Sequence, residues 1–279
     1  MSKIISLIAS CKARPAFLYY FIESYLNYTH DLDKTELCLH MDGAPDASVE
    51  LAERYKKYNQ KNISLSIGKG NGQSYGLNRC LEMAKGEYLY WVCDDYILPP
   101  NWDEKAIPYL KENFYISIDQ IEPGFGSFPP FHPEIGNSPE TFSIMSFNHA
   151  VKNRENEIKD EVGFVFGSGL FSTEKVKKIG GWPEDFDPYT ANDIAFVTLM
   201  HRVYPELIFY KSKNISVFHF QYGAVRDNPD IKEAAKDAVL RYERRFNCTF
   251  DQTLKDIKEQ SEKNWIKYNF WSILGKTYD

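Results

Sequence analysis

The sequence predicts an α/β fold in which a mostly parallel sheet is flanked by helices. Short apolar runs alternate with helical patterns through the first hundred residues, as expected for strands joined by crossover helices. Hydrophobic residues make up 43% of the chain, which is ample for a packed core. The 279 residues allow one large domain, or a catalytic domain with a substantial appendage.

The first half of the chain contains four strand patterns separated by helical spacing. Pro15 stands where a helix begins, and glycines at 68, 70 and 72 form a loop that opens another helix. In order, the expected elements are a strand at Ile4–Ala9, a helix from Pro15, a strand at Glu36–Met41, a helix around Val49–Tyr55, a strand at Ile63–Ile67, a helix around Leu77–Ala84 and a strand at Glu87–Cys93.

The second half is less periodic. Asn101 with Glu104 resembles a capping box and predicts a helix that runs to about Asn113. Residues 122–148 crowd Pro, Gly and Phe together, above all in Gly124–Phe131, and we interpret them as a substrate-shaping loop. Regular structure is then expected at Gly163–Phe171, in helices at Thr173–Ile179 and Asp193–Val203, and in a last strand at Ile215–His219.

These patterns divide the chain into two parts. Residues 1–223 are expected to form the α/β domain, with one half at 1–112 and the other at 113–223. Residues 224–279 are expected to form a helical extension. The extension has 11 basic and 10 acidic residues and so a net charge of +1. Residues 1–223 carry a net charge of −7, which gives the total of −6.

Composition excludes several classes of protein. A net charge of −6 argues against a surface built throughout to bind nucleic acid. No apolar run approaches the ~20 residues of a membrane span, so we expect a soluble, cytoplasmic protein. The five cysteines have no C-x-x-C spacing and are interpreted as reduced thiols.

Three aspartates fall at or just beyond predicted strand ends: Asp42, Asp94 and Asp95. The carboxyl ends of parallel strands line the ligand crevice of such a sheet, so these carboxylates are expected to share one site. A divalent cation that bridges a diphosphate would relieve their repulsion. The alternative is structural, because an acid pair also ends a strand and caps a helix, and Asp42-Gly43 alone suits a plain turn.

Several ordered motifs resemble the family 2 glycosyltransferases of the GT-A fold over about residues 3–112 and 163–222. The matching segments are Ile4–Asn27, His40–Gly43, Gly70–Arg79, Ala84–Tyr88, Trp91–Pro99, Gly167–Phe171, Ile179–Glu184 and Ala191–Asp193. Two positions depart from the family pattern: Cys93 replaces the first acid of a D-x-D motif, and Asn192 replaces the glutamate of a Glu-Asp pair. The resemblance implies a GT-A, Rossmann-like fold and a nucleotide-sugar donor. It makes residues 1–223 the catalytic domain, with 1–112 as the nucleotide-sugar-binding half and 113–223 as the acceptor-side half.

The resemblance also implies roles for individual residues. It assigns Asp193 as general base on the acceptor hydroxyl, and Asp95 with His219 as ligands of Mn²⁺ or Mg²⁺. The expected nucleotide-sugar contacts are Ser10, Arg14, Asp42, Asn78, Arg79 and Asp94. The expected acceptor contacts are Trp182, Tyr189 and Asn192.

Each of these assignments has a structural alternative. Asp193 directly precedes an apolar helix and would serve equally as its N-cap. His219 lies between aromatic residues, where a histidine is often part of the core. The aromatic residues expected at the acceptor either form a platform for a sugar or belong to the core: Trp182, Tyr189 and the Gly124–Phe131 segment. The two arginines, Arg14 and Arg79, either approach the diphosphate or are solvated.

The expected activity is metal-dependent, inverting transfer of a sugar from a nucleotide-sugar, with UDP as the nucleotide, to a hydroxyl on a saccharide or another acceptor. One alternative is sugar transfer to a modified nucleic-acid base, with Arg241, Arg244 and Arg245 recruiting DNA. The other is a catalytically silent nucleotide-sugar-binding protein, suggested by Cys93 and Asn192 in place of acids.

Overall fold

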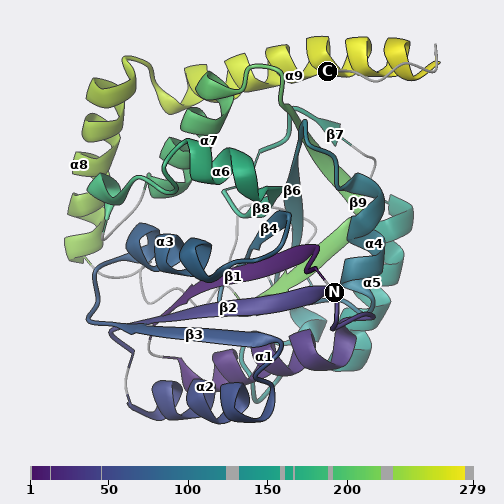
Figure 1. The fold of residues 1–279 in the computed structure, drawn as a ribbon, viewed down its shortest axis with the longest axis vertical. Helices are drawn as coiled ribbons and strands as arrows, with labels where there is room; N and C mark the ends of the chain where they lie inside the picture. Colours follow the sequence, from purple (N-terminus) through teal and green to yellow (C-terminus); the bar gives the residue numbers. More distant parts are fainter. Residues whose placement is uncertain are drawn as a thin grey trace.

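The computed structural model describes residues 2–12, 14–44, 46–123, 132–157, 161–165, 167–187, 191–220 and 229–273. Within these residues the strands form one sheet in the order β3-β2-β1-β4-β8-β6-β9-β5, and β7 pairs with β9 outside this path (Figure 1). The strands are β1 Ile5–Cys11, β2 Thr35–Asp42, β3 Ile63–Gly68, β4 Tyr88–Trp91, β5 Tyr96–Ile97, β6 Phe114–Ile121, β7 Glu161–Val162, β8 Gly169–Ser172 and β9 Ile208–His219.

The N-terminal side of the sheet is parallel. Strands β3, β2, β1 and β4 run in the same direction, which brings the carboxyl ends of β2, β1 and β4 to one edge. Strand β8 is antiparallel to both β4 and β6, whereas β6 and β9 are again parallel. The predicted mostly parallel α/β sheet is confirmed, with the antiparallel strands confined to β5, β7 and β8.

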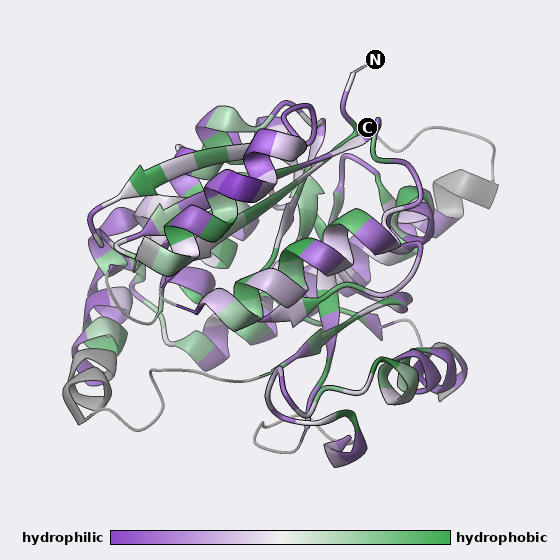
Figure 2. Cartoon of the chain, turned by 90° about the horizontal axis from the view of Figure 1, so that it is seen from below, coloured by the Kyte–Doolittle hydropathy of each residue, from purple (hydrophilic) through white to green (hydrophobic). Residues whose placement is uncertain are grey.

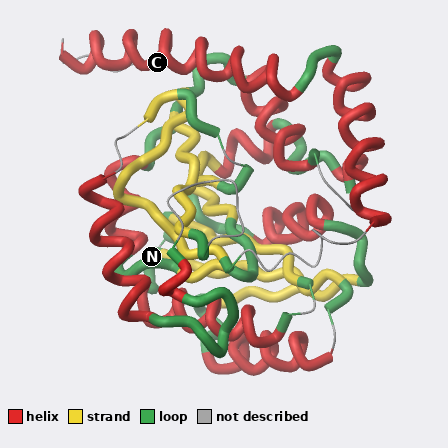
Figure 3. Tube along the Cα trace, turned by 180° about the vertical axis from the view of Figure 1, so that it is seen from behind, coloured by secondary structure: helices red, strands yellow, loops and turns green. Residues whose placement is uncertain are grey.

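Helices cover both faces of the sheet. Helices α1 and α2 lie on one face, and α3, α6 and α7 lie on the other (Figures 1 and 3). The coloured helices carry both hydrophilic and hydrophobic residues, as expected of amphipathic helices that place one side on a sheet (Figure 2). The helices are α1 Pro15–Tyr28, α2 Asp46–Tyr58, α3 Gln73–Met83, α4 Trp102–Ala106, α5 Ile144–Glu157, α6 Thr173–Lys178, α7 Asn192–Val203, α8 Pro229–Phe246 and α9 Phe250–Ile273. None of these described helices has the length and apolar character needed to cross a membrane.

Helix α5 is held to the sheet by a buried ion cluster. Arg154 donates to both carboxylate oxygens of Asp119 on β6, at 2.9 and 3.0 Å. Lys211 and Ser216 of β9 also contact this carboxylate, at 3.0 and 2.8 Å. A buried carboxylate with this many donors fixes the position of α5 against β6 and β9.

Helix α9 crosses the end of the sheet and is seen along the top of Figure 1. Ser261 accepts the backbone N–H of Phe209 at 3.1 Å, and Asn264 donates to the carbonyl of Leu207 at 3.1 Å. Ile257 is buried with the side chains under α3 and α7, whereas Trp265 stacks on Tyr210 in the core on the other face. Helix α9 of the extension therefore packs against the hydrophobic core on each face of the sheet.

The structure corrects several predicted elements. The helix expected to reach Asn113 ends at Ala106, because Pro108 follows, and Asn101 has a φ of 56° without a side-chain cap bond, so there is no capping box. Strand β6 was not predicted, and α5 lies partly within the expected loop at residues 122–148. Strand β9 has 12 residues, far more than the expected Ile215–His219. Of the segment Gly163–Phe171, only the end belongs to β8.

Candidate active site

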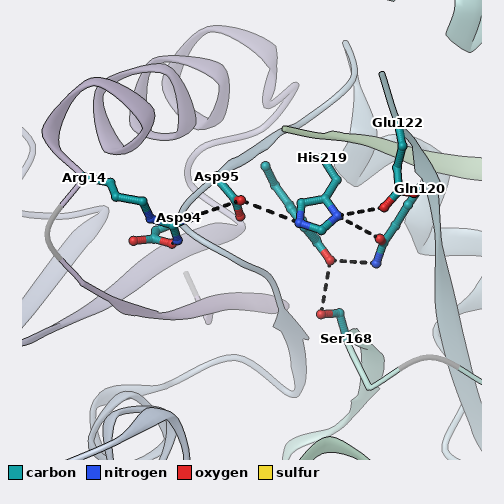
Figure 4. A network of polar contacts seen from close by, with 8 residues as sticks. Arg14, Asp94, Asp95, Gln120, Glu122, Ser168 and His219 are labelled. Carbon is teal, nitrogen blue, oxygen red and sulfur yellow. Dashed lines mark hydrogen bonds and ion pairs between the residues drawn. The ribbon is translucent and has the colours of Figure 1, made fainter. Parts of the chain in front are cut away.

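The acid pair lies at the carboxyl edge of the central parallel strands. Asp94 and Asp95 follow β4 and are both buried, with 3% of each residue exposed. Arg14, in the segment after β1, forms ion pairs with both carboxylates, and its distance to Asp95 is 3.2 Å (Figure 4). The backbone N–H of Lys12 donates to Asp94 at 3.1 Å. Since β1 and β4 are parallel neighbours, their ends necessarily meet here.

His219 reaches the same place from the other end of the chain. Antiparallel pairing of β5 with β9 sets Tyr96 opposite His219, so the imidazole lies beside Asp95. Its Nε2 is 3.6 Å from Asp95 Oδ2, while Nδ1 is 3.0 Å from oxygens of both Gln120 and Glu122 (Figure 4). Because both partners of Nδ1 are acceptors, Nδ1 donates a proton and Nε2 is the nitrogen directed at the acid pair.

These contacts change the acidity of the groups. Burial raises the pKa of Asp94 to about 6, against the opposing effect of Arg14. Burial acts in the same direction on Asp95, but its hydrogen bond to His219 lowers the pKa of Asp95 below its usual value. Burial lowers the pKa of His219, yet Asp95 and Glu122 outweigh it and raise this pKa to about 9. Positive charge is therefore favoured beside Asp95.

The residues present fit a divalent cation. Two ligands that each lie about 2.1 Å from an ion are roughly 3 to 4 Å apart. The 3.6 Å between Asp95 Oδ2 and His219 Nε2 falls in this range. Glu122 holds the far side of the imidazole, as carboxylates do in histidine metal sites. Among the described residues no three His, Cys, Asp or Glu side chains form a metal-binding group, so the protein would leave coordination positions open.

Asp42 and Ser10 support the loop and helix beside this edge. Asp42, at the end of β2, accepts the backbone N–H groups of Asn71 and Gly72 at 2.8 and 2.9 Å. Ser10 of β1 lies under α3, where a Cβ at Gly76 would come within 2.1 Å of its hydroxyl oxygen. Both residues therefore fix the segment that begins α3, and their predicted contacts with a nucleotide stay predictions.

Asn78 and Arg79 are not brought to the acid pair. The Asn78 amide donates to the Trp182 carbonyl at 2.9 Å and to Glu184 at 2.8 Å, and it accepts the Trp182 N–H at 2.8 Å. Arg79 pairs with Glu82 one turn along α3, at 2.7 Å. Asn78 thus holds the turn after α6, and Arg79 lies on the helix surface. Their predicted donor contacts stay predictions.

Trp182 is a core residue. Only 2% of it is exposed, and its ring stacks on Phe196 at 4.4 Å between centroids and meets Trp91 edge to face. A sugar platform needs an exposed ring face, which Trp182 does not offer in this structure, and its predicted acceptor role stays a prediction. Tyr189 and the Gly124–Phe131 segment, the other predicted aromatic platforms, lie outside the described residues.

Asp193 stands in the first turn of α7, two residues after Ala191, which has a φ of 68°. Asn192 joins this turn to α3: its amide donates to Gln73 Oε1 at 2.9 Å and accepts the Asp193 N–H at 2.9 Å. Asn192 is itself buried and bridges the two helices, and its predicted contact with an acceptor stays a prediction.

The Asp193 carboxylate lines a cavity of about 250 Å³. Asp193 is exposed to solvent, and partial desolvation by the protein atoms around its carboxylate raises the pKa of Asp193 above its usual value. The segment at Gly167 and Ser168 adjoins both Asp193 and the residues beside the acid pair. The Cβ of Asp193 lies over Gly167, and Ser168 Oγ is 3.4 Å from the hydroxyl of Tyr96. A candidate base and a candidate cation site thus flank one short segment.

Four polar residues of the site were missed by sequence reasoning: Gln73, Tyr96, Gln120 and Glu122. Glu122 and Gln120 lie at the end of β6, a strand that was not predicted. An acid directly after a strand of Phe, Tyr and Ile was the available signal for Glu122. Gln73 carried no signal, because its partner Asn192 is 119 positions away.

Comparison with known proteins identifies the family. The model of glycosyl transferase family 2 matches residues 6–179, which is more than half of the chain. A comparison with curated proteins finds no match.

Solved structures share the fold at low sequence identity. TarS of S. aureus is similar with a TM-score of 0.56 at 15% identity, over 85% of this chain and 39% of that chain. TarS 1–349 in complex with UDP-GlcNAc gives 0.56 at 12%, over 99% and 93%. The mannosyltransferase PcManGT from Pyrobaculum calidifontis, in complex with GDP-Man and Mn²⁺, gives 0.61 at 11%, over 96% and 76%. The chain belongs to glycosyl transferase family 2, and it is a glycosyltransferase of the GT-A fold.

Proposed function

We propose that this glycosyltransferase moves one sugar from a uridine diphosphate sugar to a hydroxyl of a saccharide or another acceptor, with inversion of the anomeric carbon. The observation that carries the proposal is the meeting of Asp95 and His219, flanked by Asp94 and Arg14, at the carboxyl edge of β1 and β4. Solved structures of similar fold contain UDP, UDP-GlcNAc or GDP-Man, which supports a nucleotide-sugar donor.

Asp95 and His219 would hold Mn²⁺ or Mg²⁺, and a bound cation would neutralise charge on the departing diphosphate. Arg14 already lies between the two aspartates, where its guanidinium can donate to diphosphate oxygens as well as to carboxylates. Glu122 and Gln120 keep the His219 ring in one orientation through Nδ1. The site is therefore arranged before a donor arrives.

Asp193 acts as the general base. Its carboxylate takes the proton of the acceptor hydroxyl as that oxygen bonds to the anomeric carbon. The bond from this carbon to the diphosphate breaks at the same time, and the diphosphate leaves with the electron pair. Among the described residues that line the cavity, Asp193 is the carboxylate in reach of an acceptor, which supports direct displacement with inversion.

A thermal-shift experiment tests the donor proposal. UDP-GlcNAc and GDP-Man are each added with and without Mn²⁺, and the unfolding midpoint is measured. We expect a UDP-sugar to raise the midpoint only when Mn²⁺ is present. A midpoint that none of these additions changes would contradict the proposal.

The base is tested by Asp193→Asn. This variant should lose transfer by about 100-fold or more, while UDP still raises its unfolding midpoint in the presence of Mn²⁺. Asp251→Asn on the exposed start of α9 is the matched control and should keep full activity. Turnover retained by Asp193→Asn would refute the assignment.

Transfer to a nucleic-acid base receives no support from α8. Arg241 donates to the carbonyl of Asp185, and Arg245 forms an ion pair with the Asp185 carboxylate. Both side chains therefore attach α8 to the turn before α7 and do not form a free basic stripe for phosphates.

A further inference from the structure

The cavity beside Asp193 has walls from three segments of the chain. Val165 comes from the segment before β8, Ile194 and Val197 come from α7, and Phe250 and Leu254 come from α9. The family model ends at residue 179, so α7 and α9 lie beyond the matched region. The C-terminal extension thus forms one wall of the cavity that holds the candidate base.

The described walls of this cavity are apolar except at Asp193. Its one charged wall group among the described residues is Asp193, and the five other side chains named above are apolar. Leu254 is 39% exposed, so its side chain does not fill the space in front of it. Hydroxyl groups placed against Val197, Phe250 and Leu254 would lose their hydration without gaining a partner.

The size of the cavity sets the size of its ligand. An apolar cavity of roughly 150 Å³ holds a benzene molecule. The volume here is about 250 Å³, enough for a ring or a short aliphatic group together with a hydroxyl directed at Asp193. A saccharide without an apolar substituent could donate a hydrogen bond to the Asp193 carboxylate, but its other hydroxyl groups would lie against apolar walls.

We propose that this cavity is an acceptor subsite for an alcohol with an apolar group directly beside the reactive hydroxyl, such as an aromatic or aliphatic substituent. The apolar group packs against Phe250 and Leu254, and the hydroxyl lies at Asp193. The inference rests on the proposed role of Asp193 as base, and it gives α9 a part in acceptor choice.

Binding of two fluorinated probes to the full chain tests the inference by ¹⁹F NMR, without donor or metal. The probes are 4-fluorobenzyl alcohol and 4-fluorotoluene, which differ in the hydroxyl. Leu254→Trp fills the cavity and Leu254→Ser removes an apolar wall. Leu240→Trp on α8, at a leucine that is 49% exposed, is the matched control.

We expect the alcohol to bind the wild type and the Leu240→Trp variant equally, and both Leu254 variants about tenfold more weakly or worse. The alcohol should bind more tightly than 4-fluorotoluene, and this difference should vanish in Asp193→Ala. Absence of binding to the wild type, equal binding to the Leu254 variants, or a difference that survives in Asp193→Ala would overturn the inference.

The outcome is separable from that of the proposed function. A chain that hydrolyses UDP-GlcNAc with Mn²⁺ but binds neither probe contradicts the acceptor subsite alone. A chain that binds the probes through Leu254 and shows no donor binding contradicts the proposed donor chemistry alone.

Discussion

Single residues in the site divide into those that a sequence pattern can place and those that it cannot. Asp94 and Asp95 could be predicted, because they follow a buried strand whose end must face the crevice. Asn78 and Trp182 lie in motifs that resemble those of the family, but a motif does not tell which way a side chain points. In the structure both side chains make internal contacts. Glu122 depends on the register of β6 against β9, which no local pattern contains.

The raised pKa of Asp193 predicts a pH dependence. The base acts when deprotonated, and partial desolvation of the carboxylate favours its neutral form. kcat/KM should therefore fall as the pH drops through a pKa above the usual aspartate value of about 4. Steady-state rates at saturating Mn²⁺ give this profile, and UDP binding measured over the same range separates the base from the donor site. A profile that stays flat down to about pH 4 would contradict the role of Asp193.

At the scale of elements, the first turn of α3 is joined to the turn before α7 and to the first turn of α7. Asp187 accepts the N–H groups of Ser74 and Tyr75 at 3.0 and 2.9 Å, and Gln73 accepts the amide of Asn192. The two helices were predicted from apolar spacing, but their contact was not, because it depends on tertiary packing. Strand β6 was missed for a different reason, because it follows directly after a segment with helical spacing.

Gln73→Ala should therefore slow transfer by about 10- to 100-fold in kcat, because Asn192 no longer holds the turn that carries Asp193. UDP binding should change little. Gln73→Glu keeps an oxygen that accepts from Asn192 and should restore most of the rate. Gln60→Ala, in the exposed turn after α2, is the control. A loss of UDP affinity equal to the loss in kcat, without rescue by Gln73→Glu, would indicate a structural role only.

At the scale of the whole molecule, the C-terminal extension is part of the folded core. The predicted boundary at residue 223 separates the helices in sequence, yet α9 contributes Ile257 to one core and packs Trp265 against the other. An amphipathic pattern predicts that a helix has a partner but does not identify the partner. The extension was predicted to be helical, and its place across the sheet end came from the structure alone.

Ile257→Ala should lower the free energy of unfolding by about 2–5 kcal/mol, because it leaves a cavity at a fully buried site. Ile266→Ala changes the same residue type on the same helix at a position that is 69% exposed, and it should cost less than about 0.5 kcal/mol. Urea unfolding of both variants gives the comparison. Equal effects would mean that α9 does not close the core.

Mn²⁺ titration in the presence of UDP tests the central claim most directly, since Asp95 and His219 are proposed to hold the cation that meets the diphosphate. Calorimetry on the wild type should show Mn²⁺ binding that UDP strengthens. Asp95→Ala and His219→Ala should each weaken it by about 10-fold or more, while His149→Ala at an exposed position of α5 leaves it unchanged. Mn²⁺ binding of equal strength in the wild type, Asp95→Ala and His219→Ala would contradict the account.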